Sequence, residues 1–207
     1  MKRLVIVGAG GHGKVVAEAA ELSGFRHIVF VDDRYPELKT VGRWAVLGKA
    51  NSEALKTSAA DYFVVAVGDN SLRLGLHNGL RDSGFEPLSI IHPRAVVSVS
   101  AKLGQGSVVF ANAVINADAT VGEACIINTC AVVEHDCVLQ EGVHVSPGVN
   151  LGGGVVVGRC SWLGIGATVI PYKIIGTKVV VGAGGVVVTD LPDGVIAKGV
   201  PARYIYE

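Results

Sequence analysis

Every sixth residue between Ile91 and Val187 is leucine, isoleucine or valine, seventeen times in succession. These anchor positions are Ile91, Val97, Leu103, Val109, Ile115, Val121, Ile127, Val133, Leu139, Val145, Leu151, Val157, Leu163, Val169, Ile175, Val181 and Val187. A period of six fits neither the 3.6-residue repeat of a helix nor the simple alternation of a strand. It is typical of a parallel β-helix, in which the chain winds into stacked coils.

Small side chains often stand two residues before an anchor. They are Ala95, Ala101, Ser107, Ala113, Ala119, Cys125, Ala131, Cys137, Ser161 and Ala167. Residues at i−2 and i share one face of a strand, so both positions are expected to face a core that stacked coils make continuous. Glycine often follows the anchor directly, and there we expect it to ease a tight or positive-φ backbone. These glycines are Gly104, Gly122, Gly152, Gly158, Gly164, Gly176 and Gly182.

The first part of the chain has a different pattern. Short apolar runs at 3–7, 27–31 and 62–68 predict strands, and helices are expected at 14–23 and 70–83. Strands that alternate with helices indicate a small parallel α/β domain of Rossmann-like type. We therefore predict an α/β domain over residues 1–88 and a parallel β-helix with a C-terminal tail over residues 89–207.

A glycine loop follows the first predicted strand and matches G-x-G-x-x-G at Gly8, Gly10 and Gly13. Asp32 ends the second predicted strand, where a carboxylate can bind ribose hydroxyls. The loop favours a nucleotide diphosphate, because glycines let the backbone approach and a helix N-terminus binds phosphate. A domain of this size lacks the second half that NAD usually needs. The alternatives are a plain glycine turn and, for His12, an ordinary surface histidine.

Polar residues at the corners of the β-helix are the candidates for chemistry. Glu134, His135 and Asp136 form one such corner, where the carboxylate of Asp136 can hydrogen-bond the imidazole and raise its basicity. If three hexads make one coil, Gly153 lies beside His135 at the strand spacing of about 4.8 Å. A base beside an exposed amide suits acyl transfer, in which the amide receives the oxyanion. His144 is expected to face outward, and an exposed turn residue is the alternative for either histidine.

Composition narrows the class. The formal net charge is zero, which argues against nucleic acid or an anionic membrane as the main partner. The four cysteines show no metal spacing, so we expect no metal and reduced thiols in a cytoplasmic protein. We expect Cys125 and Cys137 to face inward, and Cys130 and Cys160 to lie at corners.

Six stretches carry a resemblance that spans the whole chain. They are VGAGGHGKVVAE (7–18), FVDD (30–33), VGDNSLR (67–73), INTCAVVEHDCVL (127–139), HVSPG (144–148) and KGVPAR (198–203). With them the chain resembles the bacterial UDP-amino-sugar N-acetyltransferases of the hexapeptide-repeat superfamily, related to the sialic acid O-acetyltransferases. The resemblance implies a left-handed β-helix, a homotrimer, acetyl-CoA between adjacent solenoids and a UDP-sugar on the N-terminal domain.

The resemblance also implies roles for single residues. His135 is similar to the family's general base, Gly153 to its oxyanion-binding amide and Asp136 to the base's partner, although the family pattern has Glu at that position and Glu134 is a rival. The implied substrate residues are Gly10, Gly11, His12, Gly13, Asp32, Asp33, Gly68 and Asn70. The implied acetyl-CoA residues are His144, Gly153, Gly164, Ile165, Gly166, Ala183, Gly184 and Lys198, with Lys178 as a further candidate for the CoA phosphates. For Lys178 and Lys198, an ordinary solvent-exposed lysine is the alternative.

The expected reaction is transfer of acetyl from acetyl-CoA to an amine of the sugar, with C4 as the expected position. Three other functions stay open. The same histidine apparatus serves O-acetylation of a sugar such as sialic acid, the glycine loop alone would suit an NAD(P)-linked oxidoreductase, and the solenoid could be a non-catalytic trimeric scaffold.

Overall fold

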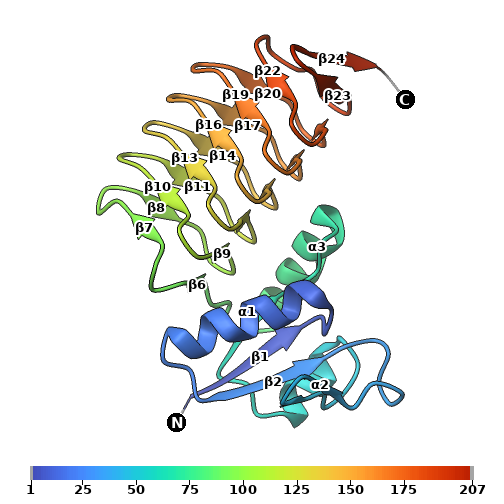
Figure 1. Cartoon of the computed structure of the whole chain (residues 1–207). Helices are drawn as coiled ribbons and strands as arrows, with labels where there is room; N and C mark the ends of the chain where they lie inside the picture. The colour runs from blue at the N-terminus through green and yellow to red at the C-terminus, as the bar shows by residue number, and fades with distance from the viewer. Residues whose placement is uncertain (1, 206–207) are drawn as a thin grey trace. The chain divides into compact units, whose positions relative to one another are not determined.

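A computed structural model describes residues 2–205 (Figure 1). The chain divides into two compact units, residues 1–93 and residues 94–207, and each is described by itself. Within residues 2–205, no helix combines the length and the apolar character that crossing a membrane requires.

The first unit is built on a three-stranded parallel sheet in the order β2-β1-β5. Its strands are β1 (Arg3–Val7), β2 (His27–Val31) and β5 (Tyr62–Val65). Helix α1 (Gly11–Leu22) packs against β1, and α3 (Asn70–Asp82) packs against β5. Val5, Val7, Val31, Phe63 and Val65 form the centre of the buried core. Both faces of this sheet are covered, which explains why its strands are continuous apolar runs rather than alternating ones.

Some elements differ from those predicted. Helix α1 begins at Gly11, three residues earlier than expected, so the end of the glycine loop forms the first turn of the helix. Strand β5 ends at Val65 rather than residue 68. Three short elements were not predicted: β3 (Thr40–Val41), β4 (Trp44–Ala45) and α2 (Ser52–Thr57). Two-residue strands and a six-residue helix are too short to produce a periodic signal.

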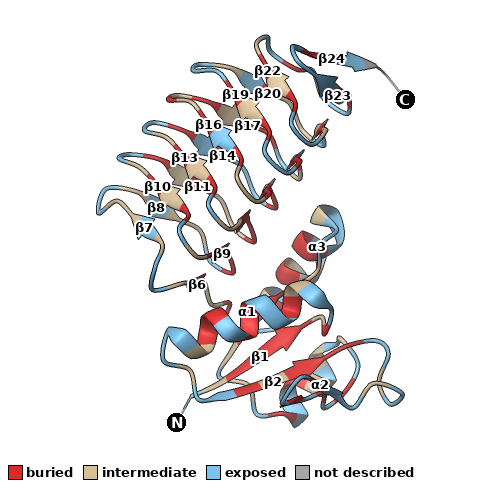
Figure 2. Cartoon of the chain, viewed as in Figure 1, coloured by how far each residue is buried: buried red, intermediate tan, exposed pale blue. Residues whose placement is uncertain are grey.

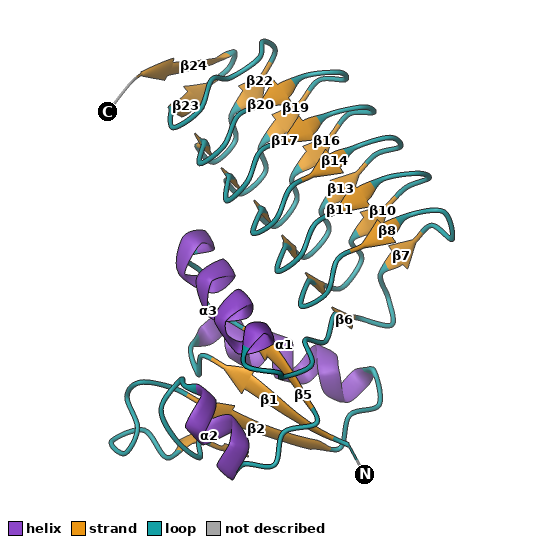
Figure 3. Ribbon diagram, turned by 180° about the vertical axis from the view of Figure 1, so that it is seen from behind, coloured by secondary structure: helices purple, strands orange, loops and turns teal. Residues whose placement is uncertain are grey.

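The hexads form seventeen strands of two residues, and each strand ends on its anchor. They are β6 (Ile90–Ile91), β7 (Val96–Val97), β8 (Lys102–Leu103), β9 (Val108–Val109), β10 (Val114–Ile115), β11 (Thr120–Val121), β12 (Ile126–Ile127), β13 (Val132–Val133), β14 (Val138–Leu139), β15 (His144–Val145), β16 (Asn150–Leu151), β17 (Val156–Val157), β18 (Trp162–Leu163), β19 (Thr168–Val169), β20 (Ile174–Ile175), β21 (Val180–Val181) and β22 (Val186–Val187). Figure 3 shows the coils from behind, with turns between the short strands.

Parallel pairing joins each strand residue to the one eighteen positions away, as it joins Ile115 to Val133. Three hexads therefore make one coil, as expected. The second unit contains three parallel stacks of strands, β7-β10-β13-β16-β19-β22, β8-β11-β14-β17-β20 and β9-β12-β15-β18-β21. The last stack continues into β23 (Ile196–Gly199) and the antiparallel β24 (Ala202–Ile205).

The anchors fill the interior of the solenoid. All fourteen anchors from Val109 to Val187 are buried, as the red band along each coil shows (Figure 2). Val97 and Leu103 are only partly buried, because they lie in the first coil of the solenoid unit. Cys125 and Cys137 are buried, whereas Cys130 is exposed and Cys160 is partly exposed. From Val109 onward the phase of the repeat therefore predicted side-chain direction correctly, whereas the first anchor of the series, Ile91, is exposed.

The glycines that follow the anchors correct one expectation. None of these seven glycines has positive φ; the left-handed residues lie three positions after the anchor, at fourteen consecutive corners from Gly106 to Gly184. A Cβ on Gly158 would lie 2.5 Å from the carbonyl carbon of Gly176, in the next coil. At positions such as Gly158, glycine is favoured because neighbouring coils approach closely there, not because of backbone twist.

Candidate active site

The His135 corner, residues 134–136, follows β13, where the inward-facing Val133 precedes three polar residues. Asp136 has a left-handed φ of 60°, and its N–H donates to the carbonyl of Ala117 at 3.0 Å. The corner exposes both His135 and Asp136, and the imidazole Nδ1 lies 2.8 Å from Asp136 Oδ2. Because a carboxylate only accepts hydrogen bonds, Nδ1 carries the proton and Nε2 is left as an acceptor. The predicted pair is therefore present.

The electrostatics of this corner favour a basic imidazole. The hydrogen bond from His135 to Asp136 raises the pKa of His135 above its usual value, with further help from the charges of Asp136 and Glu134. Partial desolvation opposes this rise. A carboxylate partner of this kind makes a histidine a stronger base and fixes its tautomer.

Glu134 does not compete for the imidazole. Its Oε2 accepts a hydrogen bond from Asn116 Nδ2 at 2.9 Å and a longer one from the backbone N–H of His135 at 3.4 Å. Between the two candidate carboxylates, the geometry thus selects Asp136 as the group that holds the His135 ring. The shorter aspartate reaches the ring from a left-handed corner position.

Gly153 lies directly against the ring of His135. A Cβ on Gly153 would be 2.5 Å from both Cε1 and Nε2, so a larger residue would displace the imidazole. The two coils are joined here by a hydrogen bond from Gly154 N–H to the carbonyl of His135 at 2.9 Å. Among hydrogen bonds within residues 2–205, none uses the N–H of Gly153 as donor. The corner thus combines a base with an amide that has no acceptor in these residues.

His144 lies in a different stack of strands, in β15. Asn128 Nδ2 lies 3.4 Å from its Nε2, and the Trp162 ring stacks on it with 6.2 Å between centroids and an angle of 18°. Trp162 Nε1 in turn donates to the buried Ser146 Oγ at 2.8 Å. Asn128 and Trp162 were not predicted from the sequence; the eighteen-residue spacing between His144 and Trp162 was the signal that could have found the latter.

Five of the eight implied acetyl-CoA residues lie at or beside another corner of the solenoid, which we name the Ile165 corner. It follows the stack that holds His144 and includes Ile165, Gly166, Ala183 and Gly184, all exposed. Gly184 N–H donates to the carbonyl of Ile165 at 2.8 Å, so these pairs are stacked one coil apart. Gly164 is buried beside them, whereas Lys178 lies at the third corner and Lys198 in β23. Within one chain, the His135 corner and the Ile165 corner are therefore separate.

The glycine loop of the first unit divides into packing and open positions. Gly13 is packed, since a Cβ there would lie 2.2 Å from the carbonyl oxygen of Gly8 and 3.0 Å from Phe30. Gly10 caps the N-terminus of α1 and Gly11 begins it, and an added Cβ would meet nothing within 4 Å at either position. Open amides at a helix N-terminus suit an anionic ligand such as a phosphate.

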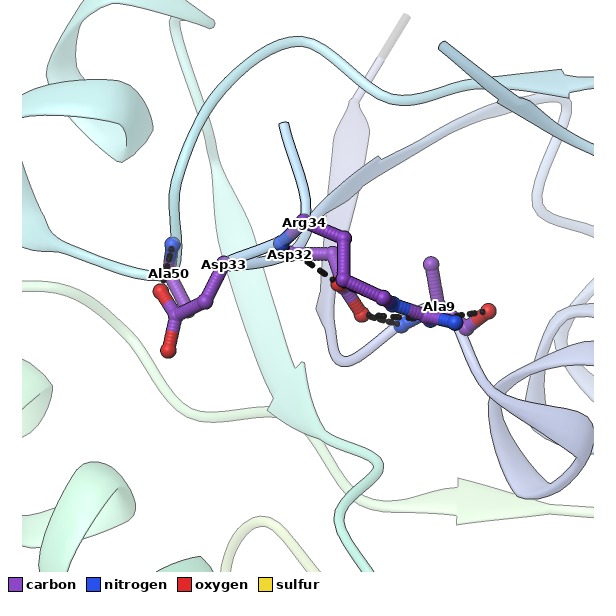
Figure 4. Close-up of polar contacts among 5 residues, drawn as sticks. All are labelled: Ala9, Asp32, Asp33, Arg34 and Ala50. Carbon is purple, nitrogen blue, oxygen red and sulfur yellow. Dashed lines mark hydrogen bonds and ion pairs between the residues drawn. The ribbon is translucent and has the colours of Figure 1, made fainter. Parts of the chain in front are cut away.

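Asp32 is held by the first unit itself (Figure 4). Its Oδ2 accepts from the Ala9 N–H at 2.7 Å, and Arg34 donates to both carboxylate oxygens at 2.8 and 3.0 Å. The Arg34 side chain, ahead of the Ala9 amide, lowers the pKa of Asp32 to about 2. Asp33 accepts from the Ala50 N–H at 3.1 Å. Asp32 thereby links the end of β2 to the glycine loop. The contribution of Arg34 was not predicted from the sequence.

His12, Gly68 and Asn70 lie near the same end of the sheet. His12 is half-buried in α1, and burial, assisted by the charge of Arg73, lowers its pKa to about 4, so it is neutral at pH 7. Gly68 is exposed, and Asn70 begins α3, where its Oδ1 accepts from Arg73 at 2.8 Å. Arg73 was not singled out, although it lies in the stretch 67–73. No group of three or more metal-ligating side chains gathers anywhere in residues 2–205.

The comparisons with known proteins agree with this architecture. Residues 3–80 match the family described as the PglD N-terminal domain. The chain is 42% identical over 113 residues to the UDP-N-acetylbacillosamine N-acetyltransferase of Bacillus subtilis, and this match spans 54% of the chain and 52% of that relative, about half its length.

Two solved structures match over nearly the full chain. The acetyltransferase domain of PglB from Neisseria gonorrhoeae, in complex with acetyl coenzyme A, is 41% identical with a TM-score of 0.93, covering 99% of each chain. A variant of the perosamine N-acetyltransferase from Caulobacter crescentus, in complex with CoA and GDP-perosamine, is 44% identical with a TM-score of 0.94, covering 100% of this chain and 98% of that one. The fold is that of the left-handed β-helix acetyltransferases. The chain belongs to the nucleotide-sugar N-acetyltransferases of the hexapeptide-repeat superfamily that carry a PglD-type N-terminal domain.

Proposed function

We propose that this protein transfers the acetyl group of acetyl-CoA to the amine at C4 of a UDP-linked amino-deoxy sugar, with His135 as the general base. The observation that carries the proposal is the His135 corner. There, an imidazole with its Nδ1 bound to Asp136 presents Nε2 beside the backbone of Gly153. A neutral imidazole with a raised pKa is suited to accept a proton at the moment an amine attacks.

The reaction follows from these groups. The sugar amine attacks the thioester carbonyl and gives one proton to His135 Nε2, while Asp136 stabilises the imidazolium that forms. The N–H of Gly153 donates to the oxyanion of the tetrahedral intermediate. When the intermediate collapses, the C–S bond breaks and the imidazolium returns its proton, so that CoA leaves as a thiol. The amine is nucleophilic enough that no acyl-enzyme is required.

We further infer that the active site is completed by a second copy of the chain in a homotrimer. Ile165, Gly166, Ala183 and Gly184, which are implied for acetyl-CoA, lie at the Ile165 corner. His135 and Gly153 lie at the His135 corner of the same solenoid. Residues on two separate corners of a triangular coil can meet at one site only when they come from adjacent copies. Cyclic symmetry would then create three equal sites.

The nucleotide is the least defined part of the substrate. The Bacillus subtilis relative is named for a UDP-linked sugar and the Caulobacter crescentus structure contains GDP-perosamine. The first unit has one three-stranded sheet with an open helix N-terminus, which suits a nucleotide diphosphate of either kind. UDP is our first choice, and GDP is the second candidate because the GDP-perosamine match covers the whole chain.

The test is a panel of acceptors incubated with acetyl-CoA. UDP- and GDP-linked 4-amino sugars are compared with free and CMP-linked sialic acid, and released thiol and acetylated product are measured. We expect amide product from a nucleotide-linked amino sugar and no ester product from the sialic acids. Failure to turn over any amino sugar would refute the proposal, and ester formation would favour the O-acetyltransferase alternative. A thermal shift with UDP but none with NAD(H) or NADP(H) separates the proposal from an oxidoreductase.

A further inference from the structure

Arg73 is a buried cation that the reaction above does not use. It lies in the first turns of α3, its exposed fraction is 1%, and it is the largest fully buried side chain in the described residues. Arginine is rarely buried to this extent unless its donors are satisfied, because an ion removed from water loses its hydration. Its partners therefore show what the side chain is for.

The Arg73 guanidinium binds one short segment of chain. Its Nη1 donates to the carbonyls of Val67 at 3.0 Å and Gly68 at 3.2 Å, and its Nη2 donates to Asn70 Oδ1 at 2.8 Å. All three acceptors belong to residues 67–70, which comprise the end of the connection from β5 and the first residue of α3; we name this segment the 67–70 loop. A planar fork with several donors is suited to hold a loop in one conformation, which an ammonium group cannot do as well.

The 67–70 loop borders the glycine loop. Strands β1 and β5 are paired, and just beyond them Ala66 N–H donates to the carbonyl of Val7 at 2.7 Å. A Cβ on Gly8 would lie 2.9 Å from the carbonyl oxygen of Ala66. The charge of Arg73 also contributes to the lowered pKa of His12, in the glycine loop. Arg73 thus contacts the 67–70 loop and acts through its charge on His12. Both loops lie at the carboxyl end of the parallel strands, where ligands of open α/β sheets bind.

We propose that Arg73 is a positioning residue for nucleotide-sugar binding, a role that rests on the proposed function. Its guanidinium holds the 67–70 loop so that Gly68 and Asn70 face a nucleotide diphosphate on the adjoining glycine loop. Burial, with a smaller contribution from the charge of Arg73, keeps His12 neutral, so the imidazole can approach a phosphate as a hydrogen-bond donor. Arg73 acts on affinity for the nucleotide sugar and has no part in acetyl transfer at the solenoid.

The experiment compares Arg73→Lys and Arg73→Gln with Arg81→Lys and Arg81→Gln. Arg81 is the matched control, because it lies on the same helix but is partly exposed and forms an ion pair with the adjacent Asp82 at 3.5 Å. Steady-state assays give kcat and the KM of each substrate, and calorimetry gives the Kd of UDP and GDP. Thermal unfolding shows the temperature range over which each variant is folded, and assays stay below it.

We expect both Arg73 variants to raise the KM of the nucleotide sugar and the nucleotide Kd by roughly tenfold or more, with Lys less affected than Gln. The KM of acetyl-CoA and kcat should stay within about twofold of the parent values, and the Arg81 variants should match the parent. An unchanged nucleotide-sugar KM in folded Arg73 variants overturns the inference, as does an equal effect on both substrates. A parent enzyme that turns over no nucleotide amino sugar overturns the proposed function instead.

A measurement on the parent protein covers the case in which the Arg73 variants do not fold. Amide hydrogen exchange is followed with and without UDP, and with and without GDP. The inference requires slower exchange in residues 67–71 and in the glycine loop when the bound nucleotide is present. Protection of the glycine loop alone would show that the 67–70 loop does not take part in binding, and would overturn the role of Arg73.

Discussion

The two units of this protein use glycine for different purposes. In the solenoid, glycines such as Gly158 follow the anchors because the next coil leaves no space for a side chain. In the first unit, Gly10 and Gly11 have open space around them and leave the N-terminus of α1 accessible. The comparison shows that one residue type supports packing in a repeat and ligand access in a loop. The space around the missing Cβ distinguishes the two roles.

The units also differ in how they hold charged groups. The carboxylate of Asp32 is buried and occupied by Ala9 and Arg34, so it stabilises a loop. The His135–Asp136 pair is exposed at a corner, and Asp136 binds Nδ1 of the imidazole rather than Nε2. We interpret the first unit as a binding module and the solenoid as the catalytic one. Substitutions in each unit test that division, and they follow in order of decreasing effect.

Replacing His135 with alanine should separate catalysis from binding most sharply. We expect acetyl transfer to fall by about 10²–10⁴-fold, because general-base catalysis is lost. The Kd of UDP should be unchanged, since the first unit retains its nucleotide loops. Steady-state kinetics and calorimetry measure the two effects. His27→Ala, an exposed histidine of the first unit, is the control, and retained activity in the His135 variant would refute the assigned base.

Alanine at Gly158 and at Gly10 compares the two uses of glycine directly. In Gly158→Ala, the new Cβ meets the Gly176 backbone at 2.5 Å, so we expect the free energy of unfolding to fall by about 2–4 kcal/mol. Gly10→Ala should stay within about 0.5 kcal/mol of the parent, because φ is −86° and space is open. Calorimetric unfolding of both variants provides the measurement. Equal stabilities would contradict the close-approach explanation.

Replacing Asp32 with asparagine should destabilise the first unit. The pKa of this carboxyl falls from 3.8 to about 2 on folding, which corresponds to about 2 kcal/mol of stability. Because the folded pKa is depressed, this contribution is complete above about pH 4–5 and is lost as the pH falls toward 2. The variant should therefore be less stable than the parent at about pH 7, with a smaller difference near about pH 3.

Urea unfolding at several pH values measures this dependence. Asp33→Asn is the matched control, because Asp33 is exposed and accepts one backbone hydrogen bond from Ala50. A difference between Asp32→Asn and the parent that did not change with pH would show that the carboxylate charge is not the cause.

Asp136→Asn should move the pH profile of the reaction. The pKa of His135 is raised, so the parent's kcat/KM should increase with pH through a value above 6.5, as the imidazole loses its proton. Without the carboxylate, this limb should shift to lower pH, and the plateau should fall by about tenfold because the ring is less well held. In Asp136→Glu, the increase of kcat/KM should occur at a pH close to that of the parent. A profile unchanged in Asp136→Asn would exclude Asp136 as the partner of the base.

Glu134→Gln provides the control for that profile. Glu134 contacts Asn116 and the His135 backbone rather than the ring, and it raises the pKa of His135 only through its charge. We therefore expect a smaller shift of the limb than in Asp136→Asn and little change in the plateau. A larger effect from Glu134 would reverse the assignment of the two carboxylates.

The solenoid and the phase of its side chains could be predicted from the amino-acid pattern. Because the hydrophobic repeat is local and regular, the anchor series located every two-residue strand from β6 to β22, and the spacing of eighteen residues put Gly153 beside His135. The pattern also located β1 and β2 at their observed bounds. It missed α2, β3 and β4, which are too short to show a period, and the two strands β23 and β24 of the C-terminal tail.

Which polar groups meet became clear only in the folded chain. In the folded chain, His135 pairs with Asp136 rather than Glu134, and Arg34 donates hydrogen bonds to Asp32. Arg73 is buried and donates hydrogen bonds to the 67–70 loop. These contacts depend on the left-handed corner at Asp136 and on loops whose direction no periodicity encodes. Hydrophobic burial repeats along a chain and can be predicted from its spacing, whereas a hydrogen bond depends on angles and on distances of a few tenths of an ångström.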